Sequence, residues 1–128
     1  MTARYLVGSR LGRGAFATVK KGWARRGLSP VALKFIPKEA AEAPEAVWRQ
    51  QGRELAVMRR LAHPCLARLL DHAESALELV LVMELCRGGE LGAWARLARE
   101  RGDLTEELVM FWFYQVATAL LTCSICST

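Results

Sequence analysis

Apolar residues recur at the spacing of β-strands in the first part of the chain. Residues 5–11 and 18–23 are predicted as two strands, and the glycines between them indicate a hairpin turn. A third apolar run, Val-Ala-Leu-Lys-Phe-Ile, covers residues 31–36 and is closed by Pro37. The opening of the chain therefore predicts three strands in succession.

The next stretch predicts one helix and then two further strands. Pro44 suits the first turn of a helix, where the missing N–H would have no helical partner, and residues 46–61 follow with apolar positions at helical spacing. Residues 66–70 and 77–84 are predicted as strands, and the nearly continuous apolar run in the second indicates burial on both faces. The apolar residues on one side of the predicted helix are Val47, Trp48, Leu55, Met58 and Leu61.

The last part of the chain predicts two helices. The first runs from Glu90 to about Arg99, and the second covers residues 108–121 with Thr105 as its N-cap. Residues 108–128 contain no charged side chain, and their length and apolarity also fit a membrane-spanning helix. Polar residues within the segment favour a buried core helix instead, and such a helix expects protein on most sides.

Composition places the chain among globular proteins. It has 128 residues, of which 52% are apolar and 24% charged, enough for one modest domain. The net charge of +5 would suit an anionic partner, but the arginines are spread along the chain, so a solvated basic surface is the simpler interpretation. The four cysteines are too sparse for a disulfide scaffold and indicate a reducing, cytoplasmic location. Cys123-x-x-Cys126 lacks a second pair or a nearby His that would complete a zinc site.

The Gly12-x-Gly14 turn between two strands is a candidate phosphate loop. Glycines let backbone N–H groups approach phosphate oxygens closely. By itself the pattern is weak, because glycines in hairpins mostly serve the turn alone. It is neither a dinucleotide fingerprint, since no helix follows, nor a Walker loop, since no Gly-Lys-Ser/Thr is present.

Lys34 and Glu54 form a second candidate feature. Lys34 lies in an otherwise apolar strand, where it either faces solvent, which is the usual case, or is buried and requires an anion. Glu54 lies on the predicted helix one turn before Met58, where it is either solvated or points inward. An inward Glu54 would need a cation, and Lys34 is the obvious one.

These signals occur in a fixed order, and together with two further motifs they resemble the front half of a eukaryotic serine/threonine protein kinase domain. The resemblance covers Tyr5 to about Leu121. It implies an α+β fold, with a five-stranded antiparallel sheet and one helix in a first lobe, then a hinge and the first two helices of a second lobe. The expected boundaries are residues 1–84 for the first lobe, 85–89 for the hinge, 90–121 for the start of the second lobe and 122–128 for a divergent tail. The motifs are Gly12-x-Gly14 with Val19, Val31-Ala32-Leu33-Lys34, Glu54, His63-Pro64 and Gly88-Gly89-Glu90-Leu91.

The resemblance implies an ATP site, with protein substrates or regulators as further partners and neither nucleic acid nor membrane. Lys34 would hold the α- and β-phosphates and pair with Glu54, and these two residues have the expected catalytic roles. Met58 and Leu69 match two positions of the family's regulatory hydrophobic column. The residues expected to bind ATP are Leu11, Gly12, Gly14, Ala17, Val19, Ala32, Lys34, Met83, Glu84, Cys86 and Glu90.

Their implied roles differ along the chain. The loop glycines and Ala17 would cover the phosphates, and Val19 and Ala32 would sandwich the adenine. Met83 would be the gatekeeper. Glu84 and Cys86 would offer backbone groups to the adenine edge, and Glu90 would face the ribose or a basic substrate residue.

Two segments are similar to different kinase subfamilies. Ala17 stands where the third loop glycine is usual, and together with residues 81–86 and the Gly-Gly pair it is similar to the unc-51-like autophagy-initiating kinases. Residues 31–38 are closer to the fused kinases of hedgehog signalling.

The chain contains no His-Arg-Asp loop and no Asp-Phe-Gly motif. In the family these supply the catalytic base and the magnesium ligands. We therefore expect weak ATP binding at best, magnesium only in a full-length kinase, no metal site here, and no catalysis by these 128 residues alone. Three interpretations stay open: a fragment of an active kinase, a truncated isoform that acts as a non-catalytic binding module, and a tail-anchored membrane protein. The apolar helix at residues 108–121 also predicts self-association.

Overall fold

The computed structural model describes residues 3–14, 17–38 and 44–126. The chain divides into two compact units. The first unit comprises Met1–Arg60 and Ala67–Leu85, and the second comprises Leu61–Leu66 and Cys86–Thr128.

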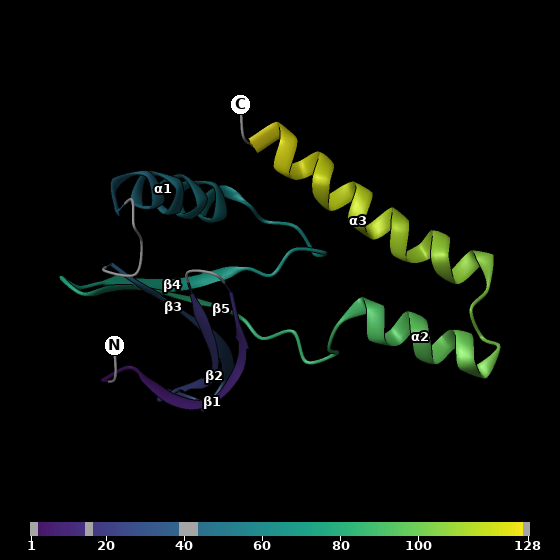
Figure 1. Ribbon diagram of the computed structural model, residues 1–128, viewed down its shortest axis with the longest axis horizontal. Helices are drawn as coiled ribbons and strands as arrows, with labels where there is room; N and C mark the ends of the chain where they lie inside the picture. The colour runs from purple at the N-terminus through teal and green to yellow at the C-terminus, as the bar shows by residue number, and fades with distance from the viewer. Residues whose placement is uncertain (1–2, 15–16, 39–43, 127–128) are drawn as a thin grey trace. The chain divides into compact units, whose positions relative to one another are not determined.

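A five-stranded sheet forms most of the first unit (Figure 1). Its strands in chain order are β1 (Tyr5–Arg13), β2 (Thr18–Ala24), β3 (Pro30–Pro37), β4 (Leu69–Glu74) and β5 (Glu78–Glu84). The order across the sheet is β1-β2-β3-β5-β4, and every neighbouring pair is antiparallel. The predicted α+β fold with a five-stranded antiparallel sheet is therefore confirmed.

Both faces of the sheet bury apolar side chains, because successive residues of a strand point to opposite faces. The helix α1 (Pro44–Arg60) covers one face, where Leu55 and Met58 pack against the sheet. The double burial predicted for β5 is confirmed, since residues 79–82 are at most 3% exposed. The buried cluster under α1, here called the helix-side cluster, contains Ile36, Leu79 and Leu81, and the cluster on the other face contains Val31, Leu33 and Val82.

The two edge strands of the sheet are joined by a side-chain contact. The Tyr5 hydroxyl on β1 donates a hydrogen bond of 3.0 Å to Asp71 Oδ2 on β4. Burial raises the pKa of the Tyr5 hydroxyl, and the hydrogen bond to Asp71 raises it further, so the hydroxyl keeps the proton that it donates. The Tyr5 ring also packs against the cluster of Val31, Leu33 and Val82. The sheet therefore curls around this cluster.

The strand predicted at residues 66–70 is displaced in the structure, where β4 spans Leu69–Glu74. A turn occupies the residues before it, since the N–H of Leu66 donates to the His63 carbonyl at 3.1 Å. The apolar pattern was misleading because β4 contains Asp71 and His72. Both polar side chains find partners, Asp71 in Tyr5 and His72 in Arg59 of α1.

The second unit contains two helices, α2 (Leu91–Arg101) and α3 (Glu106–Cys126). Gly102 ends α2 in the left-handed conformation, with φ 76°. The predicted N-cap of α3 is confirmed, because the Thr105 hydroxyl accepts a hydrogen bond of 3.2 Å from the N–H of Leu108. The helix α3 runs to Cys126, five residues beyond the predicted end. Polar side chains within it bond to the helix's own carbonyls, as Thr118 does to Gln115 at 3.0 Å and Thr122 to Thr118 at 3.1 Å.

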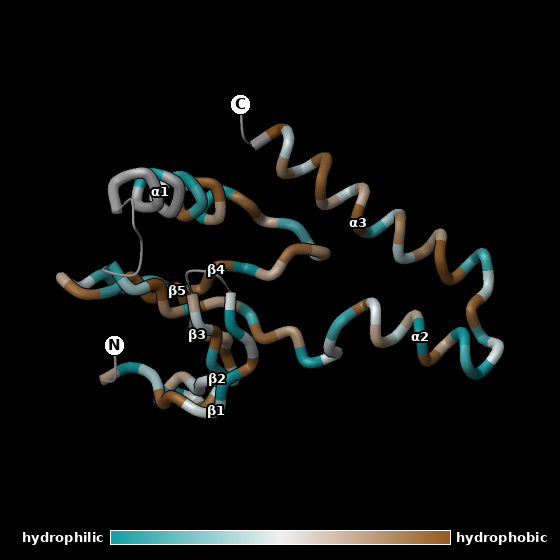
Figure 2. The backbone as a smooth tube through the Cα atoms, in the orientation of Figure 1, coloured by the Kyte–Doolittle hydropathy of each residue, from teal (hydrophilic) through white to brown (hydrophobic). Residues whose placement is uncertain are grey.

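The helix α3 is apolar along most of its length (Figure 2). Between Glu106 and Ile125 it is long and apolar enough to cross a membrane, by length and composition only. Core helices of soluble proteins pass the same test but are mostly buried, whereas only 6% of this span is buried. The prediction of a helix covered by protein on most sides is therefore wrong for the described residues, in which Ala119 is the buried apolar residue of α3. Its exposed large apolar side chains are Val109, Met110, Phe111, Phe113, Tyr114, Val116, Leu120, Leu121 and Ile125.

Candidate functional site

Lys34 and Glu54 meet in the first unit as an ion pair between β3 and α1. Lys34 Nζ lies 3.0 Å from Glu54 Oε1. The Lys34 side chain is 25% exposed and the Glu54 side chain 39%, so the pair is partly shielded from water. Of the alternatives open at the sequence level, the structure supports an inward Glu54 that meets Lys34.

Local geometry explains why the two side chains meet. Lys34 is two residues before Ile36 on β3, so both point to the face that α1 covers. Glu54 precedes Leu55 and lies one helical turn before Met58, and these two residues hold α1 on the sheet. The packing of α1 therefore brings the carboxylate over Lys34.

The glycine turn lies next to this pair in the sheet register. Gly12 on β1 pairs with Val19 on β2, and Val19 pairs with Lys34 on β3. No atom of the described residues lies within 4 Å of a Cβ atom added at Gly12, so these residues leave space beside the backbone there. A phosphate could approach such a backbone closely.

One donor of the turn is already used. The Gly14 N–H donates to the Ala17 carbonyl at 2.8 Å, while Ala17 packs against the helix-side cluster. The two residues between Gly14 and Ala17 lie outside the described residues. The Gly14 N–H thus closes the turn and does not point freely at a ligand.

The residues expected around the adenine also lie in register. Ala32 on β3 pairs with Met83 on β5, and both are half-buried. Met83 packs on the helix-side cluster together with Leu69 and Met58, the two positions expected to form a hydrophobic column. Leu11 on β1 is 51% exposed, which leaves its side chain available for contact.

At the end of β5 the backbone of Glu84 is partly occupied. Its N–H donates to the Arg68 carbonyl at 2.9 Å, and its carboxylate accepts from the Arg68 N–H at 3.4 Å. The Glu84 N–H is therefore not available to an adenine edge. Sequence reasoning did not anticipate this contact, because it depends on where β4 begins.

Cys86 and Glu90 belong to the second unit. Cys86 is an exposed free cysteine, and Glu90 precedes α2 with an extended backbone. The Glu90 side chain makes no capping hydrogen bond, although its carbonyl accepts from the N–H of Ala93 at 3.1 Å. Its carboxylate is exposed and is not used to begin the helix.

The described residues hold no cluster suited to a metal. Among residues 3–14, 17–38 and 44–126, no three or more His, Cys, Asp or Glu side chains are arranged to bind an ion. In the site formed by Lys34 and Glu54, the Lys34 ammonium group supplies a positive charge that could face phosphate oxygens.

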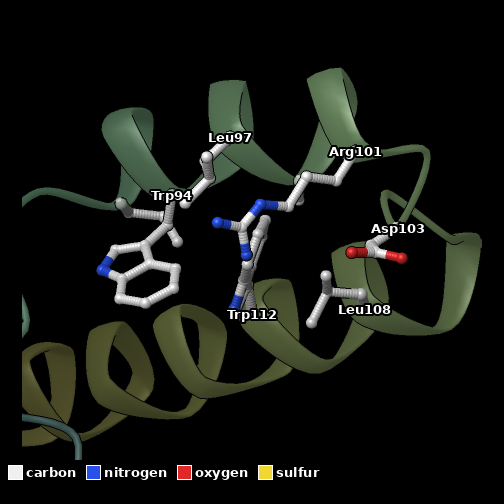
Figure 3. Close-up of a pocket in the computed structure, with 8 residues that line it drawn as sticks. Trp94, Leu97, Arg101, Asp103, Leu108 and Trp112 are labelled. Atoms are coloured by element: carbon white, nitrogen blue, oxygen red, sulfur yellow. The ribbon is translucent and has the colours of Figure 1, made fainter.

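A separate cavity of about 450 Å³ lies between α2 and α3 (Figure 3). Trp94 and Trp112 form apolar walls, and the Arg101 side chain projects between the two helices. None of the residues expected to bind ATP lines it. Sequence reasoning missed this cavity, although two tryptophans on consecutive helices were a usable signal.

Comparison with known proteins shows a consistent similarity. The model of the protein kinase domain family matches residues 5–125. CBL-interacting protein kinase 16 of Oryza sativa subsp. japonica is 38% identical over 120 residues, which cover 94% of this chain and 25% of that protein. Calcium/calmodulin-dependent protein kinase type 1B of Homo sapiens is 44% identical over 103 residues, covering 80% of this chain and 28% of that protein. CBL-interacting serine/threonine-protein kinase 2 of Arabidopsis thaliana is 34% identical over 123 residues, covering 96% and 26%.

The chain spans about a quarter of the length of these relatives. None of the three is named as an unc-51-like or fused kinase, so the comparisons do not support the predicted similarity to those subfamilies. The family match extends through α3, which accounts for this helix without a membrane. The tail-anchor interpretation therefore has no support.

Proposed function

The chain belongs to the protein kinase domain family, and from this premise we propose that it forms the ATP-binding part of a serine/threonine protein kinase. The His-Arg-Asp and Asp-Phe-Gly motifs are not among the 128 residues. The proposal therefore assigns nucleotide binding to this chain. Phosphoryl transfer onto protein Ser/Thr is assigned to a polypeptide that also includes those motifs.

The observation that carries the proposal is the 3.0 Å ion pair between Lys34 and Glu54. A lysine that is three-quarters shielded needs an anion beside it, and Glu54 supplies one at a single carboxylate oxygen. The ammonium group has three donors, so it can hold Glu54 and still face a phosphate oxygen. The carboxylate positions the lysine for that second anion.

The neighbouring residues fit the rest of a nucleotide. The open space at Gly12 admits phosphates beside Lys34 in the sheet register. Val19 and Ala32 offer small apolar side chains that could contact a planar base. Phosphoryl-transfer proteins act mainly by positioning and charge stabilisation, and these residues supply the positioning of the nucleotide.

A lysine-labelling experiment tests the proposal. The chain is treated with an acyl-phosphate derivative of ATP, which acylates lysines that lie next to bound phosphates, and the labelled peptides are mapped by mass spectrometry. We expect Lys34 to be labelled, and ATP at about ten times its Kd to reduce the labelling about tenfold, because roughly a tenth of the sites then remain free.

Lys38 is the matched internal control. Its side chain is also 25% exposed, and it is also ion-paired, with Glu74 at 2.7 Å, but it lies outside the proposed site. Equal labelling of Lys34 and Lys38, or labelling of Lys34 that ATP does not reduce, would contradict ATP binding.

A further inference from the structure

Charge is unevenly distributed along the chain. Nine of the 18 Lys and Arg residues, and none of the 13 Asp and Glu residues, lie in the first 38 positions. This segment therefore carries a formal charge of +9 and the other 90 residues carry −4. The first three strands thus form the basic part of the molecule, a feature that the even spread of arginines concealed.

Three of these basic residues line one cavity of the first unit. The cavity measures about 460 Å³ and lies where β1 begins and β2 ends. All three charged side chains at its wall are arginines. The residues that line it are Ala3, Arg4, Tyr5, Ala24, Arg25 and Arg26, here called the arginine pocket.

Backbone and side-chain contacts fix the arginine pocket in place. Tyr5 pairs with Ala24 across the β1–β2 ladder, and the Arg25 N–H donates to the Arg4 carbonyl at 2.9 Å. The Arg4 guanidinium lies 3.0 Å from Asp71, whose carboxylate also accepts the Tyr5 hydroxyl proton. Asp71 is thus shared between two donors, Arg4 and Tyr5.

A hydrogen bond and an uncommon backbone conformation define the turn that carries Arg25 and Arg26. The Ala24 N–H donates to the Ser29 carbonyl at 2.9 Å and closes the hairpin. Gly27 and Leu28 both have positive φ, 79° and 51°. A leucine seldom adopts that conformation, and Leu28 is 64% exposed, so packing of its side chain does not account for it. The turn holds two adjacent arginines at the rim of the pocket.

We propose that the arginine pocket binds a phosphorylated side chain of a peptide. Guanidinium groups match a phosphate bidentately, which lysine cannot do. A concave site with three of them suits a single compact dianion. The pocket does not depend on the proposed ATP binding, because it contains none of the residues expected to contact the nucleotide.

The arrangement of the other basic residues favours this partner over an extended polyanion. Lys20 and Lys21 are consecutive in β2 and so point to opposite faces. Each lies 5.3 Å from an aromatic ring, Lys20 over Phe35 and Lys21 over Trp23. Their charges therefore do not extend the arginine pocket into a continuous stripe, as nucleic acid or a membrane surface would require.

Fluorescence anisotropy with defined peptides tests the proposal. The probes are fluorescein-labelled Gly/Ala nonapeptides with a central phosphoserine, phosphothreonine or phosphotyrosine, each compared with its unphosphorylated form and with an aspartate in place of the phosphoresidue. At low ionic strength we expect saturable binding of at least one phosphorylated peptide, and weaker binding of both comparison peptides. The double variant Arg25→Ala/Arg26→Ala should weaken that binding about tenfold or more.

The matched control is Arg10→Ala/Arg13→Ala, which removes the same charge from exposed positions of β1 outside the arginine pocket. We expect it to change binding less than about twofold. The single variant Arg26→Ala, at an exposed turn position, should also weaken binding, so the test does not depend on the double variant alone. Equal loss in both double variants would overturn the proposal in favour of a diffuse basic surface.

Other outcomes also overturn it. Failure of all three phosphorylated peptides to bind, or equal binding of the aspartate peptide, excludes phosphate recognition. Binding to phosphatidylserine vesicles that requires Arg25 and Arg26, without any phosphopeptide binding, would assign the pocket to membranes.

Discussion

At the residue scale, Gly12 and Gly22 illustrate two different reasons for a glycine. A Cβ at Gly22 would lie 2.6 Å from Leu33 Cδ1 and 2.9 Å from the Leu6 carbonyl oxygen, whereas a Cβ at Gly12 would meet no atom of the described residues within 4 Å. Gly22 therefore serves packing, whereas no described residue occupies the space beside Gly12. The substitution Gly22→Ala should lower the free energy of unfolding by about 1–3 kcal/mol.

Urea unfolding followed by circular dichroism measures this effect, with Gly12→Ala as the control. Gly12→Ala should leave the unfolding free energy within about 0.5 kcal/mol of the parent chain. If Gly12→Ala were as destabilising as Gly22→Ala, the space at Gly12 would have a structural role, and its assignment to phosphates would lose support.

The Glu74 carboxyl group is expected to make the stability of the chain depend on pH. The hydrogen bond from Lys38, at 2.7 Å, and its positive charge hold the pKa of the Glu74 carboxyl below its ordinary value of 4.5. The folded state therefore binds this proton less readily than the unfolded state. The ionised Glu74 carboxylate therefore stabilises the folded state. This stabilisation is complete above pH 4.5 and is lost as the pH falls through the pKa of Glu74 in the folded state.

The variant Glu74→Gln isolates this contribution. At pH 7 the parent chain should be the more stable of the two, and the difference should shrink below pH 4.5. Thermal unfolding at several pH values measures it. The control is Glu100→Gln, which removes the same charge from an exposed position of α2. A difference between parent and Glu74→Gln that does not change with pH would contradict the prediction.

At the scale of elements, the contact between Tyr5 and Asp71 joins β1 to β4 and so closes the curl of the sheet. Tyr5→Phe removes this hydrogen bond and leaves Asp71 with Arg4. The expected cost is about 0.5–1.5 kcal/mol of unfolding free energy, measurable by urea unfolding. Tyr114→Phe is the matched control, because Tyr114 is 69% exposed and should give no change. If Tyr5→Phe changed the free energy of unfolding no more than Tyr114→Phe does, the edge contact would contribute nothing to stability.

The sequence predicted the elements whose apolar pattern agrees with their burial. Strand β5 and helix α1 lie where their periodicity indicated, within two residues at each end. Strand β4 was misplaced because Asp71 and His72 break the apolar pattern, and their partners Tyr5 and Arg59 are far away in the sequence. Helix α3 was predicted too short, because beyond the predicted end Thr122 donates its hydroxyl proton to the Thr118 carbonyl and so continues the helix.

The two sites also differ in how far the amino-acid pattern predicts them. Lys34 and Glu54 could be paired from the sequence, because the strand and the helix that hold them each show a clear apolar pattern. The arginine pocket could not, because Arg4 meets Arg25 and Arg26 only through the register of β1 and β2. Pairing register depends on contacts along both strands, and a bulge such as the one between Val7 and Arg10 shifts it.

At the scale of the whole molecule, the helix α3 exposes large apolar side chains along most of its length. Phe113 is 66% exposed and Leu120 is 63% exposed. They are seven residues apart on α3 and therefore lie on one face of the helix. An exposed apolar face of this size favours association. We expect the 128-residue chain, prepared by itself, to self-associate through α3.

The variant Phe113→Glu/Leu120→Lys tests this expectation. It places two charges on that face without changing the net charge, so the chain should shift from oligomers to monomer in size-exclusion chromatography with light scattering. The control Leu28→Glu/Leu77→Lys alters two equally exposed leucines of the first unit, at 64% and 67%, and should leave the oligomers intact. A parent chain that is already monomeric would contradict self-association. Monomers from both variants would show that general surface apolarity, and not α3, holds the chains together.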